Sequence, residues 1–582
     1  MSGAVMTHPK RLAAAEELAR SAPPGALRVV MDPDPAGKPS VLRTALCAWS
    51  AIEDGATHHL VVQDDMILSG AFFERVRMAI EEMPDAALAL FALWDSRNGA
   101  AVRFGAMTGA RWVGAVNEYF PCVAIILPRR VAAGFVAYGR RHLDSWPDDI
   151  LMYRYLRANG IPSYVSVPNL AEHEDHGSIS GNAFRGPRRS VCFVPSDVPG
   201  HEGTRLTGLS VLPFFKQGVA QCAVRLDGPG PRPWLHLDCE QYLEGSGVRA
   251  ERLQSAIVRM AGAATPGIAR GTWLTAFTMG FVHRREAHRC DPSDSGGAPD
   301  PAVFAEALAT VGPGGISYAQ SEDQIAQLRE ELARITRAGV EAGREAGARP
   351  RAGRSGRFRR VGVLGTTTPL GEHILRGLTD RGHRVTALDP ARRDGSAARR
   401  DDPAALDGVP PAWDTVLDLT ALHDGEATLR DRRTGACTLY VGDLYGPGCS
   451  RNSPIGRMVW DALRSHPLAI EGNAGELLRP VHVSDLVEAL SMTLRTPPRD
   501  RVLSLADAAP CTVTEMAEAV RKAVRPVPVA TGAASPDAPR RREERPSRSA
   551  PPNWKPTTDL TYGLHTFAQW LAYEGIHFAP DA

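Results

Sequence analysis

The sequence predicts a multidomain α/β protein with an N-terminal α/β domain, a helix-rich middle region and a C-terminal doubly wound parallel sheet. Three observations predict this fold class. Short apolar runs alternate with helical segments over residues 1–190 and again over residues 359–582, which is typical of α/β sheets. Residues 191–347 between them carry mainly helical segments. An Arg- and Gly-rich stretch at 348–358 indicates a flexible linker.

The composition argues against several classes of protein. Lys and Arg number 67 and Asp and Glu number 66, and this balance argues against a general nucleic-acid or membrane-surface partner. The nine cysteines form no CxxC pair, which fits reduced thiols better than a zinc ribbon or a disulfide framework. No apolar run has the length of a signal-peptide core or a membrane span. We therefore expect a cytoplasmic protein without a nucleic-acid or membrane partner.

The N-terminal region alternates apolar runs with helical periodicity. The first 21 residues are polar and helical in pattern. The run ALRVVMDPDP ends in Asp and Pro, which predicts a strand followed by a loop. Further apolar runs predict buried strands, and FFERVRMAIEEM has a helical period. Strands are expected at 26–35, 58–65, 87–94 and 122–128, and a helix at 72–83.

Paired acids follow two of these strands. Asp64 and Asp65 end the run HHLVVQDD, and Asp32 and Asp34 lie in MDPDP. In an open α/β sheet, ligands bind at the carboxyl ends of the strands. Two carboxylates there can hold Mg²⁺ or Mn²⁺ against a diphosphate. The alternative is that such acids only cap the N-termini of helices.

Together these segments resemble the GT-A fold of glycosyltransferases, with a Glu/Gln-Asp-Asp variant of its Asp-x-Asp motif. SWPDDILMYRYLRANG is similar to the segment with the catalytic acid, and it carries Asp148 and Asp149. VPNLAEHEDHGSIS resembles the late segment in which a His completes the metal shell, and His173 is the first choice there and His176 the second. Helix capping is again the alternative for the two acids, and an ordinary surface position for the His.

The resemblance implies a role for each of these residues. Asp149, with Asp148 beside it, would take a proton from the hydroxyl of an acceptor that the sequence does not identify. A bound Mn²⁺ or Mg²⁺ would offset the charge of the leaving diphosphate. The expected metal ligands are Asp64, Asp65 and His173. The expected contacts to the nucleotide-sugar are Asp32, Asp34 and Asp64.

The middle region contains one clearly predicted helix at 321–343. Ser321 and Gln324 form a capping box at its start. Apolar residues then follow at helical spacing, which predicts packing on the protein's own domain. The alternative is a short coiled-coil contact in a homodimer, although the pattern lasts only about two heptads. The Gly-rich segment 310–317 is expected to be a turn.

The C-terminal region opens with the pattern of a dinucleotide-binding βαβ unit. A strand at 361–364 runs into a turn at Gly365, a helix and a second strand that ends at Asp389. The helix N-terminus presents free N–H groups to a pyrophosphate, and Gly371 allows close helix–strand packing. Asp389 lies where a carboxylate accepts both ribose hydroxyls, which favours NAD over NADP. Thr368 replaces the middle Gly of the fingerprint, which weakens the pattern.

Later segments resemble the extended short-chain dehydrogenases, the NAD-dependent epimerase/dehydratase family, with a Rossmann-type fold. The matching segments are DTVLDLTA (414–421), ACTLYVGDLYGPG (436–448), ELLRPVHVSDLVEAL (476–490), VLSLADAAPCTVTEMAEAV (502–520) and NWKPTTDLTYGLHTFAQWL (553–571). The resemblance implies NAD contacts from Gly365, Thr366, Thr367, Pro369, Leu370, Gly371, Asp389 and Ala421. It implies nucleotide-sugar contacts from Tyr445 and Arg479.

The chain departs from that family at the catalytic segment. The family carries Tyr-x-x-x-Lys between the strand at 414–421 and the Tyr-Gly-Pro-Gly turn, and the Tyr is its acid and base. Between Ala421 and Cys437 this chain has neither Tyr nor Lys, and the nearest Lys of the region is Lys522. We therefore expect a domain that binds NAD or a sugar nucleotide without redox chemistry, or a structural remnant. The stretch 531–552 is expected to be a disordered loop.

The preferred hypothesis is a fused sugar-metabolism protein. In it, the N-terminal domain transfers a sugar from a nucleotide donor and the C-terminal domain is a degenerate nucleotide-binding domain. Two alternatives remain. In the first, the C-terminal domain is an NAD-dependent epimerase or dehydratase with a non-standard base. In the second, neither domain is catalytic, and the protein is an assembly factor that senses NAD or a sugar nucleotide.

Overall fold

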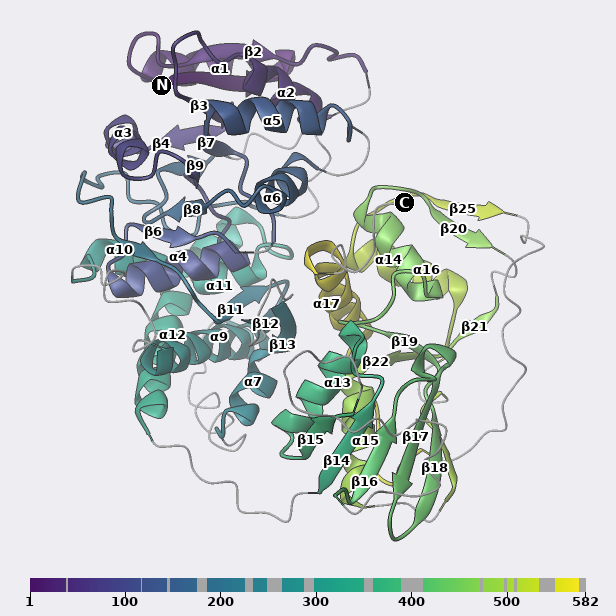
Figure 1. Cartoon of the computed structure of the whole chain (residues 1–582). Helices are drawn as coiled ribbons and strands as arrows, with labels where there is room; N and C mark the ends of the chain where they lie inside the picture. Colours follow the sequence, from purple (N-terminus) through teal and green to yellow (C-terminus); the bar gives the residue numbers. More distant parts are fainter. Residues whose placement is uncertain are drawn as a thin grey trace. The chain divides into compact units, whose positions relative to one another are not determined.

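Contacts in the computed structural model divide the chain into two compact units. The first comprises residues 1–240 and 249–350, and the second 241–248 and 351–582 (Figure 1). The predicted boundary near residue 190 therefore lies inside the first unit. The structure describes residues 1–37, 40–116, 118–143, 147–174, 186–225, 234–248, 264–286, 298–349, 359–388, 412–471, 475–496, 500–506, 510–532 and 550–574. Asp389, His176 and most of the segments 348–358 and 531–552 lie outside these residues.

The first unit is built on an eight-stranded mixed sheet with the order β10-β6-β8-β5-β7-β3-β1-β2. Strands β1, β2, β3, β5 and β8 run in one direction, and β6, β7 and β10 run in the other. The carboxyl ends of the first group therefore share one edge with the start of β7. The strands are β1 Ser2–Thr7, β2 Arg28–Met31, β3 His58–Gln63, β5 Ala87–Ala89, β6 Trp112–Gly114, β7 Ala124–Pro128, β8 Ser163–Ser166 and β10 Arg205–Leu206.

Helices accompany this sheet and supply part of its core. Phe72, Val76 and Ala79 of α3 are buried with Leu60 and Val62 of β3 in one apolar cluster. Such burial is the main stabilising contribution to a fold of this kind. The helices are α1 Leu12–Ser21, α2 Val41–Ser50, α3 Phe72–Glu82, α4 Arg97–Thr108, α5 Arg129–Gly139 and α6 Asp148–Ala158.

The N-terminal strand β1 differs from the expectation of a helical N-terminus. Its six residues are fully buried, and it pairs with β2 on one side and with β3 on the other. A strand covered on both faces shows no alternation of polar and apolar residues, so its period is hidden in the sequence. Only the second part of the segment, from Leu12, forms a helix.

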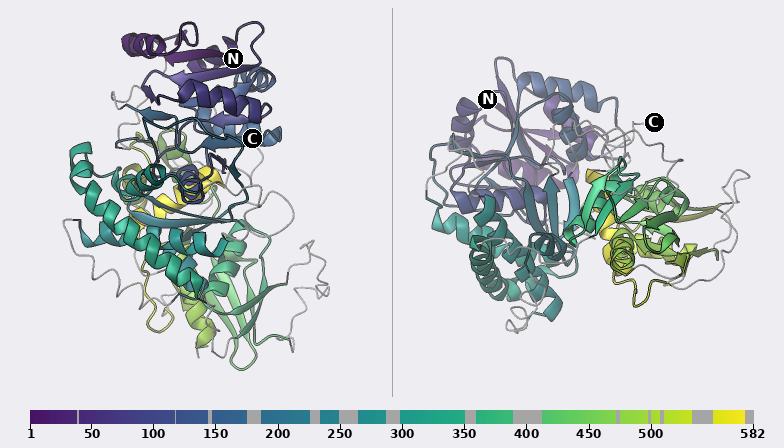
Figure 2. Two further views of the ribbon diagram at one scale, coloured as in Figure 1. Left: turned by 90° about the vertical axis from the view of Figure 1, so that its left-hand side faces the viewer. Right: turned by 60° about the horizontal axis from the view of Figure 1, so that its bottom comes forward.

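The middle region combines a three-stranded antiparallel sheet with helices. The sheet has the order β11-β12-β13. The long helices α9 and α12 pack against each other and run side by side in Figures 1 and 2. The elements are β11 Val211–Lys216, β12 Val219–Arg225, β13 Trp234–Asp238, α7 Cys239–Gly245, α9 Pro266–Glu286, α10 Pro301–Ala309, α11 Val311–Ile316 and α12 Glu322–Ala348.

Helix α12 begins at the predicted capping box, in which Ser321 and Gln324 bond reciprocally. Its glycines allow the close approach of α9: a Cβ at Gly343 would lie against the carbonyl oxygen of Phe277, and one at Gly339 within 2.9 Å of the Trp273 oxygen. The apolar face that raised the alternative of a dimer contact is therefore packed against a helix of the same chain.

The Gly-rich segment 310–317 forms helix α11, not the expected turn. Gly314 and Gly315 are required in α11 because Trp94 and Phe215 pack so closely against them that a Cβ would not fit. A Cβ at Gly315 would overlap the ring of Phe215, and one at Gly314 would lie 2.9 Å from the backbone of Trp94. Packing thus overrides the low helix propensity of glycine.

The second unit is Rossmann-like and contains a six-stranded sheet with the order β15-β14-β16-β17-β18-β23. Strand β14, helix α13 and strand β15 form a parallel βαβ unit, as the fingerprint predicts. Helix α15 packs against α13. The elements are β14 Arg360–Leu364, α13 Pro369–Asp380, β15 Arg384–Ala387, β16 Thr415–Asp418, β17 Glu426–Asp431, β18 Gly435–Tyr440, β23 Val502–Ser504 and α15 Val483–Arg495.

The sheet is mixed, so the expectation of an entirely parallel sheet is wrong. Strand β17 is antiparallel to both β16 and β18, and it lies between them. A parallel crossover needs a dozen or more residues, usually as a helix, and the residues here form a hairpin instead. Residues of β17 alternate between half-buried and buried, and Gly435 closes the hairpin turn with a φ of +85°. The hairpin spans the residues between the strand at 414–421 and the Tyr-Gly-Pro-Gly turn.

A second apolar core in this unit is formed by elements outside the six-stranded sheet. It joins helices α14, α16 and α17 with short two-stranded sheets. The elements are β19 Asp443–Tyr445, α14 Pro454–Leu463, β20 Leu468–Glu471, β21 Leu477–Leu478, β22 Pro480–His482, β24 Cys511–Thr512, α16 Val513–Ala523, β25 Val529–Gly532 and α17 Leu560–Tyr573.

We predict that Gly371→Ala destabilises the second unit. The added Cβ would lie against the carbonyl oxygen of Gly365 and within 2.7 Å of the Thr366 Cα, and both are backbone atoms. Overpacking of this kind costs about 1–3 kcal/mol. Urea unfolding measures the change. The matched control is Gly267→Ala, also in a first helical turn, where the Cβ meets nothing within 4 Å. Equal stability of the two variants would contradict the close packing of α13 on β14.

Candidate functional site

An acidic cluster lies at the carboxyl edge of the sheet in the first unit. Because β1 and β3 are parallel neighbours, Thr7 at the end of β1 lies beside Asp64 after β3. The Thr7 hydroxyl donates a hydrogen bond of 2.5 Å to Asp64 Oδ2. The carboxylates of Asp64 and Asp65 are both buried. The two acids directly follow the buried strand β3, as the sequence predicts, and the end of this strand places them at the edge.

The small sheet β4–β9 brings His173 to Asp65. Strand β4 (Met66–Leu68) pairs antiparallel with β9 (Ala171–His173), so Met66 lies opposite His173. His173 Nε2 lies 3.3 Å from Asp65 Oδ2. The N–H of Glu174 donates to the carbonyl oxygen of Asp65 over 2.8 Å, which fixes the two segments together.

Arg11 completes the cluster, and sequence reasoning missed it. One guanidinium nitrogen of Arg11 lies 3.2 Å from Asp64 Oδ1 and 2.7 Å from Asp65 Oδ2. Arg11 ends the short 3₁₀ helix Pro9–Arg11, which follows β1. A signal was present, because a basic residue soon after a first strand lies at the same edge as acids after its parallel neighbour. The interpretation of the N-terminus as helical concealed it.

The two carboxylates of the cluster have opposite pKa shifts. Burial raises the pKa of Asp64, although Thr7 and Arg11 oppose the shift. Burial also raises the pKa of Asp65, but hydrogen bonding to His173 and the charges of His173 and Arg11 outweigh it and lower the pKa. Asp65 is therefore the more firmly ionised of the pair.

A second acidic pair lies at the same edge. Asp148 and Asp149 open helix α6, and the carbonyl oxygen of Asp149 accepts from the N–H of Phe120, just before β7. Strand β7 adjoins β3, so this segment approaches the edge that carries Asp65. Burial, and next the charge of Asp149, raise the pKa of Asp148 to about 7, while Arg188 lowers it.

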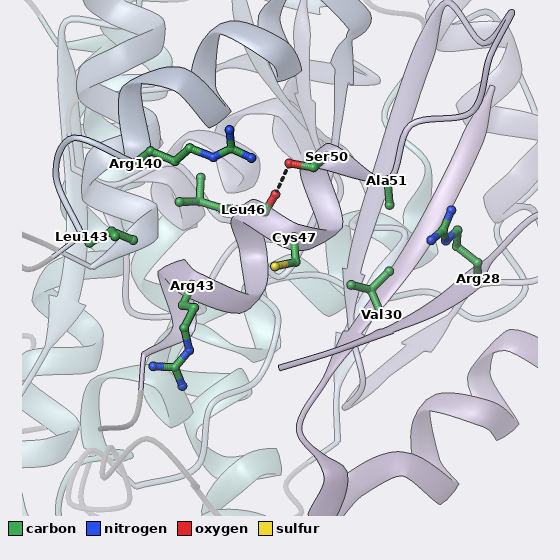
Figure 3. Close-up of a pocket in the computed structure, with 9 residues that line it drawn as sticks. All are labelled: Arg28, Val30, Arg43, Leu46, Cys47, Ser50, Ala51, Arg140 and Leu143. Carbon is green, nitrogen blue, oxygen red and sulfur yellow. Dashed lines mark hydrogen bonds between the residues drawn. The ribbon is translucent and has the colours of Figure 1, made fainter. Parts of the chain in front are cut away.

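Asp32 and Asp34 lie beyond β2 and are held by Arg43. The guanidinium of Arg43 donates two hydrogen bonds of 2.8 Å to Asp32, and it lies 3.8 Å from Asp34. The hydrogen bonds from Arg43 lower the pKa of Asp32, although burial opposes this. Arg43 also lines an open pocket of about 490 Å³ between β2, α2 and the end of α5 (Figure 3).

The cluster does not fit a divalent metal in this arrangement. Within the described part of the chain, no three or more His, Cys, Asp or Glu side chains are grouped to hold an ion. Arg11 bridges both carboxylates, and Asp64 is turned to Thr7. The guanidinium supplies the positive charge that a metal would bring. The expectation of Mn²⁺ or Mg²⁺ on Asp64, Asp65 and His173 is therefore not supported, because Arg11 already occupies the carboxylate oxygens that would bind the ion.

The β14–α13 turn in the second unit is the site where the sequence predicts a bound nucleotide, and its backbone is closely packed. Gly365 has a φ of +82°, and a Cβ there would lie 2.9 Å from the Leu419 backbone. Thr368 caps α13 by accepting from the Gly371 N–H at 3.0 Å. This bond satisfies one helix-terminal donor internally, so fewer remain for a pyrophosphate.

The other expected NAD contacts surround this turn. Thr366 is buried, whereas Thr367 is exposed. Pro369 and Leu370 open α13. Ala421 precedes the 3₁₀ helix Leu422–Asp424 at the end of β16, on the same sheet edge as Gly365. Their contact with NAD stays a prediction.

The expected nucleotide-sugar contacts are Tyr445 and Arg479. Tyr445 is the last residue of β19, and Arg479 directly precedes β22, with which β19 pairs. The backbone N–H of Arg479 donates to Asp443 Oδ2 at 2.7 Å. Tyr445 is 3% exposed, and its ring meets that of His482 edge to face at 5.2 Å. Burial raises the pKa of Tyr445 above its ordinary value. Its hydroxyl is therefore poorly placed to act as a base.

The hairpin β17–β18 carries no Tyr-x-x-x-Lys pair, because residue 444, four positions after Tyr440, is Leu. Lys522 is an exposed residue of α16, a helix whose buried face belongs to the second apolar core of the unit. Two side chains at the carboxyl edge of the sheet escaped sequence reasoning. Tyr440 ends β18, and His423 follows β16. The motif comparison directed attention to the absent Tyr and Lys, and not to these.

Comparisons with known proteins leave the family open. No protein-family model matches the chain, and no curated protein matches it. Among the described residues, no helix is long and apolar enough for a membrane crossing.

Several solved structures are similar to part of the chain. An epimerase, Mth375, of Methanothermobacter thermautotrophicus is 18% identical over 24% of this chain and 44% of its own, with a TM-score of 0.20. The UDP-glucuronic acid 4-epimerase of Bacillus cereus, with UDP-glucuronic acid and NAD, is 14% identical over 23% of this chain and 44% of its own, at 0.19. MoeE5, with the same two ligands, is 19% identical over 36% of this chain and 98% of its own, at 0.25.

These likenesses are too weak to assign an activity. The chain spans less than half the length of the first two structures. The Rossmann-like fold of the second unit is established by its own strand order and its βαβ connection.

We predict that Asp148→Asn removes a pH dependence of stability. With a folded pKa of about 7 against an ordinary 3.8, folded Asp148 keeps a proton that the unfolded chain loses. Stability therefore falls as pH rises between these values, by roughly 1.4 kcal/mol per unit. Urea unfolding at pH 5 and pH 8 should show a smaller difference for the variant than for the wild type. Asp85→Asn, at a carboxylate 74% exposed, is the control. An unchanged difference in Asp148→Asn would contradict the burial of a protonated acid.

Proposed function

We propose that this protein acts on nucleotide-linked sugars. The N-terminal unit transfers the sugar to an acceptor, and the C-terminal unit binds a nucleotide, with NAD as the expected one, without hydride chemistry. The observation that carries the proposal is the convergence of Asp64, Asp65 and His173 at one sheet edge, with Asp148 on the segment that bonds next to the start of β7 at the same edge. Carboxyl ends of strands are where α/β sheets bind ligands.

Asp148 is the better candidate for the base in this proposal, ahead of Asp149. A general base works best when its pKa lies near the operating pH, and that of Asp148 is about 7. Asp148 is buried, whereas Asp149 is half-buried. In the transfer, the base takes the acceptor's hydroxyl proton and the acceptor oxygen bonds to the anomeric carbon. The bond from that carbon to the diphosphate breaks, and the diphosphate leaves with the electron pair.

In this proposal, arginines neutralise the negative charge of the diphosphate. Arg11 lies between the two acids of the cluster, and Arg188 lies near enough to Asp148 to lower its pKa. Arg189 donates to the carbonyl oxygen of His173 at 2.6 Å. Guanidinium groups bind phosphates in bidentate fashion, so they suit this role.

The nucleotide role of the second unit follows from its turn and its hairpin. At the β14–α13 turn, Gly365 and Gly371 allow the backbone to pack closely, which supports the proposal that a dinucleotide binds there. The hairpin leaves the edge without a Tyr–Lys pair. Binding without hydride transfer is the function that these two features support together.

We predict that one UDP-, GDP- or dTDP-sugar raises the melting temperature of the full chain. A ligand at 100 times its Kd adds about 2.7 kcal/mol of stability. Asp148→Asn should keep this shift and lose transfer activity by roughly 10²–10⁴-fold, because only the base is removed. Asp85→Asn should keep both. Transfer activity is measured as the rate at which the nucleoside diphosphate is released in the presence of an acceptor.

Two results would contradict this proposal. A donor that binds and is consumed equally by wild type and Asp148→Asn would remove the base from the account. No shift with any sugar nucleotide, together with a shift by NAD alone, would favour an assembly factor that senses NAD.

A second candidate function is an NAD-dependent epimerase or dehydratase with a non-standard base. The favouring observation is that Tyr440 and His423 lie at the same edge as the Gly365 turn. Purified protein with NAD⁺ and each sugar nucleotide should then form enzyme-bound NADH, seen by its absorbance. Tyr440→Phe should lower that rate at least roughly 10²-fold. Our main proposal predicts no NADH, and formation that depends on Tyr440 would replace it.

A further inference from the structure

The cluster at the edge of the first unit already contains a cation. Arg11 contacts a carboxylate oxygen of Asp64 and one of Asp65 with the same nitrogen, at 3.2 and 2.7 Å. Its side chain is 15% exposed and theirs 9%, so solvent screens these contacts only weakly. A divalent ion on the same oxygens would face the guanidinium at close range, where two positive charges repel strongly.

Unpartnered ligand atoms remain beside this cation. Asp65 Oδ1 and His173 Nδ1 are buried and have no hydrogen-bond partner, and each residue is 7% exposed. Carboxylate oxygen and imidazole nitrogen are ligands that Mn²⁺ accepts. The cluster therefore has the chemistry of a metal site, with the ion's place between the acids taken by Arg11.

We propose that Arg11 is the permanent counter-cation of this cluster, so that the site works without a divalent metal and binds its anionic ligand through arginines. Removal of Arg11 converts the cluster into a Mn²⁺ site formed by Asp64, Asp65 and His173. The part that concerns the anionic ligand rests on the proposed function. The part that concerns the cation does not.

The arginines around the cluster differ in what they already bind. Arg11 bridges two acids, and Arg189 binds the His173 carbonyl oxygen and Glu322. Arg188 directly precedes Arg189, whose guanidinium donates to the His173 carbonyl oxygen at 2.6 Å, and Arg188 itself has no ion pair within the described residues. Arg188 is therefore the residue best able to bind a phosphate oxygen, with Arg11 keeping the edge from becoming strongly negative.

Mn²⁺ titration of the full chain tests the cation part, with free Mn²⁺ measured by electron paramagnetic resonance. The wild type and Asp65→Asn should bind Mn²⁺ equally, because in the wild type Asp65 does not contribute to a Mn²⁺ site. Arg11→Met should bind Mn²⁺ at least tenfold more tightly, and Arg11→Met with Asp65→Asn should lose this gain. Arg20→Met, at an exposed arginine of α1, should behave as wild type.

Arg11→Lys separates charge from shape in the same titration. It keeps a cation at the site, so it should remain without Asp65-dependent Mn²⁺ binding. Mn²⁺ binding by Arg11→Lys equal to that of Arg11→Met, or Asp65-dependent binding by the wild type, would overturn the proposal. If Arg11→Met fails to fold by circular dichroism, wild type against Asp65→Asn decides the question.

The ligand part is tested with UDP, GDP and dTDP as probes in place of sugar donors. The shift in melting temperature from the diphosphate that binds should be the same in EDTA and in Mn²⁺, and Arg188→Ala should remove at least half of it. A shift that requires Mn²⁺ would overturn this part. Failure of every sugar donor and diphosphate to bind would count against the proposed function and leave the Mn²⁺ result standing.

Discussion

The site in the first unit depends on one ion-pair network, in which Arg11 bridges Asp64 and Asp65. Two carboxylates buried side by side destabilise a fold unless a positive charge or hydrogen bonds compensate them. Four segments contribute to the network. Thr7 ends β1, Arg11 lies in the turn after β1, the two acids follow β3, and His173 ends β9. The pairing of β1 with β3 in the sheet core therefore sets the chemistry of the edge. The opposite pKa shifts of the two acids follow from the same contacts, because Asp65 gains the His173 hydrogen bond and Asp64 does not.

A different constraint governs the second unit. A parallel sheet needs a crossover between neighbouring strands, and the chain between β16 and β18 forms an antiparallel strand instead. The resulting hairpin preserves the sheet and its core, since Ala427, Leu429, Cys437 and Leu439 of the two strands join the central apolar cluster. The fold thus survives where the catalytic segment of the resembled family would lie.

Much of this architecture could be predicted from periodicity and turn residues. The βαβ unit at Gly365, the capping box of α12 and the strand before Asp64 followed from local patterns. The fold brings Asp65 and His173 to 3.3 Å of each other, but the metal that the resemblance implied for this pair is not supported. The errors have physical causes. Strand β1 is covered on both faces and shows no alternation, and α11 is a helix only because its glycines fit against Trp94 and Phe215. Arg11 could not be assigned without β1, so the sequence suggested a metal where the fold places a guanidinium. The hairpin could have been predicted, because polar and apolar residues alternate in ATLRDRRTGACTL on both sides of a turn. The family comparison drew attention instead to the absent Tyr and Lys.

Hydrogen–deuterium exchange of the full chain, with and without a saturating sugar nucleotide, tests the central claim most directly. The account predicts that protection gathers on four segments of the first unit: the turn after β1 that holds Arg11, the acids after β3, the start of α6 and the strand that carries His173. Protection confined to the β14–α13 turn and the ends of β16 and β18 would contradict it and move the sugar-nucleotide site to the second unit.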